Sequence, residues 1–339
     1  MSQGFFGLDL SPLRNSQQYR RLYVAGFISM LGSQATYVAA PFQLRQLTHS
    51  TLAVGSIGLV ELAPLVVFGL YGGVLADRIS RRRLIISMEF VMMASTALLL
   101  ANALFTHPVT WILYLDAAIV AGASSLQTPS ISAMNQVLVD PGLQRSASIL
   151  GNVSSTTASI VGPALGGLAA VAFGAGSVYL ANLVTFAVSL YLLSRLHAAP
   201  APDDVPESVM ESMREGVAYA KSRPDIVGTY IIDLLAMILA FPVVMLPFVA
   251  VRFHESYALS LLYCGLPFGA LLATLTSRWT HHVHRYGRAI VAAAAIWGLG
   301  IALFGASSLL WLVLAGLVIA GGADAISGVF RNTMWNESI

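Results

Sequence analysis

Charged residues are scarce in this sequence. Asp, Glu, Lys and Arg make up 10% of its 339 residues, whereas a soluble domain carries about 25%. Hydrophobic residues make up 57%, and the mean hydropathy is +0.75. This composition excludes an ordinary soluble domain and indicates a chain embedded in a lipid bilayer. The net charge of +2 is too small to suggest a nucleic-acid partner.

Cysteine and the usual sequence signs of catalysis are also scarce or missing. The single cysteine, Cys264, cannot form a disulfide within the chain. No A-x-A cleavage site follows the first apolar run, so we expect no cleaved signal peptide. Neither an H-E-x-x-H zinc motif nor a G-x-S-x-G nucleophile elbow occurs. His281, His282 and His284 lie in an arginine-rich loop, which favours a solvated loop over a metal site. We therefore expect a protein that is not an enzyme and binds no metal or cofactor.

What the sequence does contain is a series of apolar runs of about twenty residues, the length that an α-helix needs to cross a bilayer. Gly and Pro inside several of these runs are compatible with helices that pack against other helices. The runs predict an all-α membrane protein with ten spans, at about residues 22–43, 53–75, 84–105, 110–131, 147–172, 178–196, 226–250, 257–277, 289–306 and 309–330.

The basic residues predict the orientation of these spans. With a cytoplasmic N-terminus, only Arg45 and Arg252 of the 18 Lys and Arg residues fall in outer segments, and the other 16 fall in inner segments. The positive-inside rule requires such a bias. We therefore expect a multi-pass protein with its N-terminus in the cytoplasm. "Inner" and "outer" refer below to the cytoplasmic and the opposite side in this predicted orientation.

The spans group into two predicted bundles. The longest inner segment, residues 197–225, begins proline-rich and acidic, as linkers do. It separates an N-terminal bundle of six spans, residues 1–196, from a C-terminal bundle of four, residues 226–339. A short repeat relates the two, because Pro41–Ser50 and Pro247–Ser256 share their proline, phenylalanine and final serine. The repeat predicts a second bundle of six spans, of which the chain holds four and lacks the last two. The alternative is that ten is the native number.

One loop carries an unusual pattern of charge. Between the second and third predicted spans the chain reads GGVLADRISRRRLI, from Gly72 to Ile85. The loop resembles the signature loop of the major facilitator superfamily, Gly-x-x-x-Asp-Arg-x-Gly-Arg-Arg, although Ser80 stands where the family usually has glycine. The matching positions are Gly73, Asp77, Arg78, Arg81, Arg82 and Arg83.

A second stretch, GPALGG at Gly162–Gly167 in the fifth span, resembles the end of the antiporter motif found in exporters of the same superfamily. Its upstream glycines are absent, since Ile149 and Ala158 occupy those places. Its residues Gly162, Pro163, Gly166 and Gly167 are candidates for close helix packing, and that packing alone would account for them. Three further stretches resemble the enterobactin exporters of bacteria within this superfamily: LTHSTLAVG at Leu47–Gly55, EGVAYAKSRP at Glu215–Pro224 and LLYCGLPFGALLATLTS at Leu261–Ser277. This resemblance covers the whole chain, but the substrate does not follow from it.

The resemblance implies a fold and a gate. It implies the major facilitator fold of two pseudo-symmetric helical bundles, twelve spans in all, in a monomer of the bacterial inner membrane. It also implies that Asp77 grips the opposite bundle at the inner face, and Arg145 at the start of the fifth span is a candidate ion partner. A carboxylate at a helix N-terminus contributes about 0.3–2 kcal/mol, which suits a latch that must open. The arginines would anchor the span ends against anionic lipid; a purely topogenic charge cluster is the alternative.

Acidic residues inside the predicted spans are functional candidates, because an ionisable group is costly to hold there. Glu61 lies nearest mid-depth, about 12 Å from the start of its span at 1.5 Å per residue, and an apolar site disfavours its charged form. It is our first candidate for a proton or substrate residue, with a protonated packing residue as the alternative. Asp233 is the next candidate, and Asp116 lies in the outer third of its span. The remaining two acids are Glu89 and Asp324.

The polar residues of the first span complete the candidate site. Gln34, Tyr37 and Gln43 either line the substrate path or bond between helices. Since no Lys or Arg is predicted inside the membrane, a neutral or cationic substrate is favoured over an anionic one. We expect a secondary transporter that binds protons and a small molecule: a proton-coupled exporter of a siderophore, or a drug antiporter acting in multidrug resistance. The alternative is a non-transporting sensor or an inactive truncated transporter.

Overall fold

The computed structural model describes residues 9–197, 243–253, 257–276 and 286–338, with isolated positions between 228 and 235. Within these ranges the side chains at 70–78 and 332–338 are outside the description. The chain divides into two compact units between Val205 and Pro206, and each unit is treated by itself below. Of the predicted linker, residues 198–225 lie outside the described residues.

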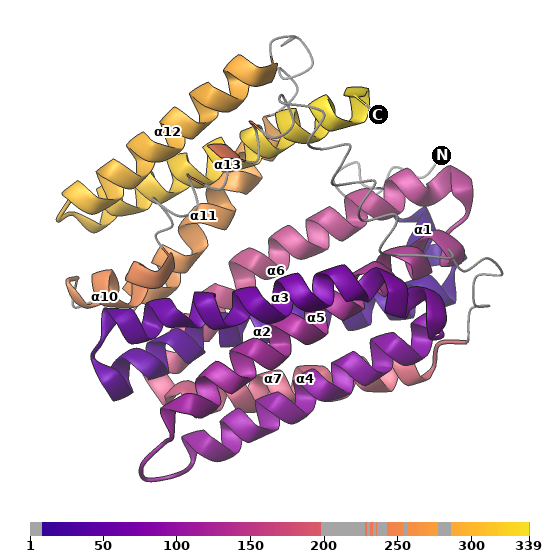
Figure 1. Ribbon diagram of the computed structural model, residues 1–339, viewed down its shortest axis with the longest axis horizontal. Helices are drawn as coiled ribbons and strands as arrows, with labels where there is room; N and C mark the ends of the chain where they lie inside the picture. The colour runs from indigo at the N-terminus through magenta and orange to yellow at the C-terminus, as the bar shows by residue number, and fades with distance from the viewer. Residues whose placement is uncertain are drawn as a thin grey trace. The chain divides into compact units, whose positions relative to one another are not determined.

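Unit 1 is a bundle of six long helices (Figure 1). A short helix, α1 (Ser11–Asn15), precedes them, and the 3₁₀ turn η2 (Pro141–Leu143) precedes α6. Against one another, α2 packs on α6 and α7, α3 packs on α5, and α4 packs on α5 and α7. The long helices are α2 (Gln17–Thr48), α3 (Thr51–Arg78), α4 (Arg81–Ala103), α5 (Thr110–Leu138), α6 (Gln144–Phe173) and α7 (Ala175–Ser194).

Local sequence accounts for several helix ends of unit 1. The Ser16 hydroxyl accepts a hydrogen bond of 3.1 Å from the backbone N–H of Tyr19 and so caps the start of α2. α2 ends where His49 adopts a left-handed conformation with φ of 53°. Gly174, with φ of 82°, separates α6 from α7 in a conformation that glycine adopts without strain.

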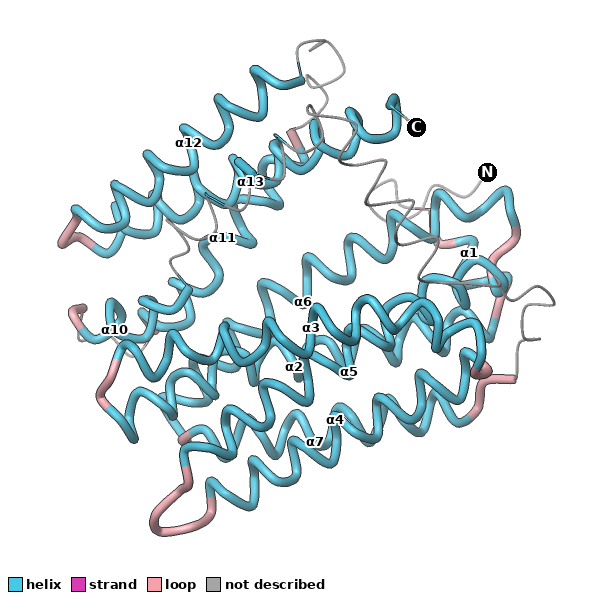
Figure 2. Tube along the Cα trace, viewed as in Figure 1, coloured by secondary structure: helices cyan, strands magenta, loops and turns pink. Residues whose placement is uncertain are grey.

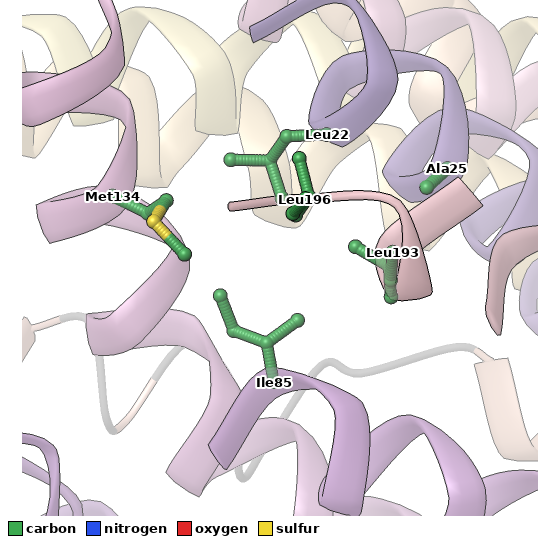
Figure 3. Close-up of a cluster of buried hydrophobic side chains, with 6 residues drawn as sticks. All are labelled: Leu22, Ala25, Ile85, Met134, Leu193 and Leu196. Atoms are coloured by element: carbon green, nitrogen blue, oxygen red, sulfur yellow. The ribbon is translucent and has the colours of Figure 1, made fainter. Parts of the chain in front are cut away.

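The inner ends of four helices of unit 1 meet in an apolar cluster (Figure 3). Each side chain of the cluster is at most 4% exposed. Helix association in a bilayer depends on such packing, because lipid is as apolar as leucine. The cluster therefore fixes the end of α7 against α2, α4 and α5. Its members are Leu22, Ala25, Ile85, Met134, Leu193 and Leu196.

Unit 2 is also helical in its described part. α13 (Leu310–Ser338) packs against both α11 (Ala258–Leu275) and α12 (Tyr286–Ala306). A short stretch formed by η3 (Val243–Met245) and α10 (Leu246–Val251) precedes them.

Glycine sets the separation of the helices in unit 2. A Cβ atom at Gly269 on α11 would lie 2.0 Å from the carbonyl oxygen of Val318 on α13, and one at Gly321 on α13 would lie 2.0 Å from that of Leu266. Real Cβ atoms never approach so closely, so the two backbones pack at a distance that only glycine allows. Gly300 on α12 and Gly316 on α13 meet in the same way.

The helices confirm the predicted all-α membrane fold. Every regular element that the structure describes is helical (Figure 2), and helices occupy nine of the ten predicted spans. The tenth, residues 226–250, lies largely outside the described residues. By length and hydropathy, seven of the described helices qualify as membrane spans. α2 and α5 are not among the seven, and both carry polar side chains along their length.

Candidate transport site

The signature loop joins α3 to α4 at the inner end of unit 1. α3 continues to Arg78 and α4 begins at Arg81, so the predicted gate residues Gly73 and Asp77 lie in the last turns of α3. The side chains of Asp77 and Arg78 are outside the description, and the gate contact of Asp77 stays a prediction. Arg81 is half-buried, and Arg145, the predicted ion partner, is exposed near the start of α6.

Two arginines bind the C-terminal end of α7. Nη2 of Arg82, from the signature loop, donates a hydrogen bond of 2.7 Å to the carbonyl oxygen of Ser194, and Nη1 of Arg21 donates one of 2.7 Å to that of Arg195. The last carbonyls of a helix have no partner within it and carry partial negative charge, so cations are favourable there. Arg82 therefore holds the point from which the chain leaves unit 1, a role beyond the predicted lipid anchor. Arg83 is exposed.

Three of the membrane acids lie on described helices of unit 1, and two of them are neighbours. Glu61 on α3 is half-buried and interacts electrostatically with Asp116 on α5. Asp116 is only 5% exposed, and its carboxylate accepts a hydrogen bond from the Ser95 hydroxyl on α4. Glu89 has a different partner, since its carboxylate accepts a hydrogen bond of 2.8 Å from Nε2 of Gln127.

The acids of the C-terminal half are less informative. Asp233, our second candidate, lies outside the described residues. Asp324 on α13 faces Arg331 two turns further along the same helix, with Nη2 and Oδ1 3.7 Å apart. Asp324 is therefore a member of an ion pair near the inner end of α13.

Two of the candidates on α2 differ in their surroundings. Nε2 of Gln34 donates a hydrogen bond of 3.1 Å to the Ser159 hydroxyl on α6, which is the helix-bonding alternative of our prediction. Tyr37 is 42% exposed and interacts electrostatically with Glu61. Tyr37 thus belongs to the surroundings of the acid pair.

Two buried hydrogen bonds between α2 and α7 involve Gln43, for which the helix-bonding alternative holds, together with three residues that the sequence did not single out: Tyr179, Asn182 and Thr36. The Tyr179 hydroxyl donates to Oε1 of Gln43 at 2.7 Å, and Nδ2 of Asn182 donates to the Thr36 hydroxyl at 2.9 Å. Tyr179 also interacts electrostatically with Asp116. The only available signal was a polar residue inside an otherwise apolar run, and such residues are too numerous here to identify a site.

The glycines of the GPALGG stretch lie where α6 approaches α2. A Cβ atom at Gly162 would lie 2.6 Å from the Cβ of Gln34, and one at Gly166 would lie 2.6 Å from the Cα of Ala35. Pro163 and Gly167 are buried on the same helix. The stretch thus brings α6 close enough for Gln34 to reach Ser159.

The chemistry that this arrangement offers is proton binding inside a polar layer. The layer joins α2, α3, α4, α5 and α7 through the contacts of Glu61 and Asp116 with Tyr37, Ser95 and Tyr179. A carboxyl group inside a membrane is expensive to hold charged, so it responds strongly to its immediate neighbours. In the described part of the chain, no three His, Cys, Asp or Glu side chains gather as a metal site would require.

Comparison with known sequences identifies a family and finds enterobactin exporters among the relatives. The family model of the transmembrane secretion effectors, a branch of the major facilitator superfamily, matches residues 8–331. The enterobactin exporter EntS of Citrobacter koseri is 30% identical over 329 residues, which are 96% of this chain and 79% of that protein. The enterobactin exporter EntS of Escherichia coli O1:K1 is 29% identical over the same shares.

Comparison with solved structures agrees on the fold. The nucleoside transporter NupG matches with a TM-score of 0.77 at 12% identity, over 95% of this chain and 83% of that one. A bacterial homologue of the human lysosomal transporter Spinster, inward-facing and unoccupied, matches with a TM-score of 0.71 at 16% identity, over 94% and 74%. At these identities the likeness shows the fold alone. The relatives and neighbours are membrane transporters, not enzymes.

Proposed function

The chain belongs to the transmembrane secretion effector family of the major facilitator superfamily, and on that premise we propose that it exports a siderophore of the enterobactin type across the bacterial inner membrane. The observation that carries the proposal is the 30% identity to an enterobactin exporter across 96% of this chain. That identity extends through both units, so it includes the parts from which a transporter builds its substrate path.

The side chains of unit 1 support an uncharged substrate. Between their basic ends, α2 and α6 carry amides and hydroxyls, such as those of Gln34, Tyr37 and Ser159. The acids Glu61 and Asp116 on α3 and α5 would repel an anionic substrate. An iron-free siderophore that carries no charge can use the hydroxyls and amides as hydrogen-bond partners without needing a counter-charge.

We further propose that export is coupled to inward movement of a proton, with Glu61 as its carrier. One elementary charge crossing a potential of 100 mV releases about 2.3 kcal/mol. At about 1.4 kcal/mol per factor of ten, one proton per cycle concentrates a neutral substrate about fiftyfold. A carrier must bind and release the proton at a depth that both sides reach in turn, and Glu61 is half-buried on α3 at such a depth.

The gate belongs to the same proposal. Asp77 at the inner end of α3 would hold the inner side closed, and Arg82, five residues further along the chain, binds the end of α7. Asp77→Asn is expected to abolish transport while leaving the amount of protein in the membrane unchanged, because the charge serves the gate and not insertion. Normal flux in this variant would remove Asp77 from the gate.

The deciding experiment uses inverted membrane vesicles that contain the full-length protein. Uptake of labelled enterobactin into energised vesicles is compared with uptake of lipophilic cationic dyes, with and without a protonophore, and with the Asp77→Asn variant as the matched inactive control. We expect enterobactin uptake that the protonophore removes. Uptake no greater than in vesicles that lack the protein would contradict the substrate, and uptake of dye alone would indicate a drug exporter instead.

A further inference from the structure

α3 and α5 run in the same direction, and their contacts fix a register between them. The Ser56 hydroxyl lies 3.2 Å from the hydroxyl of Tyr114, 58 positions later in the chain. The same Tyr114 hydroxyl donates to the carbonyl oxygen of Ala53 at 2.8 Å, an offset of 61 positions. A Cβ at Gly122 would lie 2.7 Å from Cδ2 of Phe68 and 3.4 Å from the Cβ of Pro64, at offsets of 54 and 58 positions. These contacts place the two helices side by side in a parallel register, with offsets between 54 and 61 positions.

The register brings Glu61 and Asp116 to nearly the same depth. With offsets of 54 to 61 positions, Asp116 is level with positions 55–62 of α3, and Glu61 lies within that range. The electrostatic interaction between the two carboxyls agrees with this placement. The two acids are therefore neighbours.

The two carboxyls are not equally accessible. Asp116 is 5% exposed, and the Ser95 hydroxyl on α4 donates a hydrogen bond to it. Glu61 is half-buried. Asp116 thus lies inside the helix bundle of unit 1, while Glu61 lies nearer the surface of that bundle, where a proton can arrive or leave.

The other titratable and charged groups around the pair are on the helices that pack against α3 and α5. Tyr37 on α2 interacts with Glu61, and Tyr179 on α7 interacts with Asp116. Tyr114 lies on α5 two residues before Asp116, and Arg45 lies on α2 two turns further out than Tyr37. On α4 the nearest acid to Ser95 is Glu89, six residues further in, which has its own partner in Gln127.

We propose that Glu61 and Asp116 form one proton-binding unit, which alternates between two bound protons and one and never carries two negative charges. This inference rests on the proposed function and adds a second residue to its carrier. Two carboxylates at nearly the same depth on adjacent helices repel each other in an apolar layer, and this repulsion disfavours the doubly charged state. When one proton leaves through Glu61, the remaining proton is shared between the two carboxyls, and the Ser95 hydroxyl donates to the single negative charge on the Asp116 side.

Over one cycle, the carboxyl pair releases one proton and takes up one proton, so its proton content is restored. The neutral pair releases one proton to the inner side and becomes singly negative; it then takes one proton from the outer side and becomes neutral again. The proton kept by the pair never leaves the protein. Titration of such a pair belongs to both residues together and cannot be divided between them.

The first test is a double-mutant cycle in proteoliposomes that contain the full-length protein. Enterobactin-driven proton movement is followed with a pH-sensitive dye for the wild type, Glu61→Gln, Asp116→Asn and the double variant, with equilibrium enterobactin binding measured beside it. Residues that act as a unit are not additive. We expect each single variant to lose coupled proton movement by about tenfold or more and the double variant to lose no more than that.

Glu89→Gln is the matched control, because it neutralises another buried acid of the same bundle whose hydrogen-bond partner is Gln127. It should keep the coupled proton movement. Asp116→Asn with normal proton movement, or losses that add in the double variant, would overturn the shared unit and leave Glu61 alone as the carrier. Loss in Glu89→Gln alone would also overturn it and move the carrier to Glu89.

A second measurement needs no substrate and so separates this inference from the proposed function. Infrared absorption of protonated carboxyl groups is recorded on purified wild type and the same variants as pH is changed. For a shared unit, each single substitution alters the pH dependence of the band that the other residue gives. An Asp116→Asn spectrum in which the Glu61 band keeps its pH dependence refutes the unit, even if transport is coupled. A wild type that carries enterobactin without moving protons refutes the coupling, even if the infrared bands show a shared unit.

Discussion

Glycine brings helices close together in both units, as at Gly166 with Ala35 in unit 1, and the described hydrogen bonds between side chains of different helices are added to it in unit 1. In unit 1, side chains that cross between helices make directional hydrogen bonds, such as Tyr179 to Gln43 and Gln34 to Ser159. In the described part of unit 2, the tightest contacts are between glycine and the backbone of the next helix, as at Gly269. Hydrogen bonds fix the rotation of a helix about its axis, whereas glycine contacts fix its distance from a neighbour.

This difference has a functional meaning. The acids Glu61 and Asp116 lie in the unit whose helices are locked by polar side chains, so their relative position is well determined. In the described part of unit 2, the backbones of neighbouring helices lie close together. A packing surface made of glycine and carbonyl oxygen leaves no room for added atoms. Substitutions should therefore separate the two units by the size of their effect on stability.

The largest effect is expected at Gly269. Gly269→Ala places a Cβ 2.0 Å from the carbonyl oxygen of Val318, and backbone cannot move aside as a side chain can. Overpacking of this kind costs about 1–3 kcal/mol or more, so we expect low yield and a lower melting temperature in detergent. Gly298→Ala on α12 is the control, since its added Cβ meets nothing within 4 Å. Equal melting temperatures for the two variants would show that α11 and α13 are not this close.

A smaller effect is expected at Tyr179. Tyr179→Phe removes the hydroxyl that donates to Gln43 and leaves a buried amide oxygen without that donor. Hydrogen bonds between membrane helices contribute about 0.6 kcal/mol on average and at most about 1.7. Thermal unfolding of the purified protein should show a loss within this range, while Leu180→Ile, at an exposed position of the same helix, should show none. A loss as large as that of Gly269→Ala would remove the contrast between the units.

The sequence was sufficient for the helices but not for the register between them. The ends of α4 at 81 and 103 lie near the predicted 84 and 105, because apolar length alone marks them. α5 was predicted to end at 131 and ends at Leu138, since Gln127 and Asn135 lower the local hydropathy although they lie on a helix. Gln127 reaches Glu89 on another helix, and no property of one span reveals such a partner.

The same limit applies to the acids. Sequence identified both Glu61 and Asp116 as costly groups, which is a property of each residue by itself. Counted from the predicted span starts at 53 and 110, Glu61 is 8 residues in and Asp116 is 6 residues in, so the sequence already placed them at similar depths. What the sequence could not show is that α3 and α5 pack side by side, which the contacts of Ser56 with Tyr114 and of Pro64 with Gly122 reveal.

A third prediction tests whether a polar side chain also stabilises the inner end of unit 1, where Arg82 binds the end of α7. Arg82→Gln removes the cation that binds the Ser194 carbonyl, an interaction with a helix C-terminus worth about 0.3–1 kcal/mol. We expect the end of α7 to exchange its amide hydrogens faster and to be cut sooner in limited proteolysis. Arg83→Gln, at the exposed neighbouring position, serves as the control, and equal protection in both variants would contradict the cap.

The smallest effect is expected at Asp9, before α1. Hydrogen bonds from Ser11, through its side chain and its backbone N–H, and from Ser146 hold the pKa of Asp9 below its usual value of 3.8. The carboxylate therefore fastens this segment to α6 above about pH 4 and releases it as pH falls through the lower, folded pKa.

Hydrogen exchange at α1 measures this fastening. At about pH 5 the wild type should exchange more slowly than Asp9→Asn, and the two should converge as pH falls below the folded pKa of Asp9. Asp140→Asn, at another exposed acid of unit 1, should not change α1 at either pH. A wild type that is protected equally at both pH values would show that Asp9 does not hold the segment.

The short turn between α2 and α3 has a consequence for how the protein enters the membrane. Only His49 and Ser50 separate the two helices, so neither can turn or shift without the other. α2 carries Arg20, Arg21 and Arg45 and falls short of the hydropathy of a membrane span, whereas α3 reaches a mean hydropathy of 2.0. We therefore expect the ribosome-bound chain to keep α2 at the translocon until α3 has emerged, and the two to pass into lipid as one helical hairpin. The more apolar helix, α3, would then help the less apolar helix, α2, to insert. The short connection between them would serve membrane insertion and not transport.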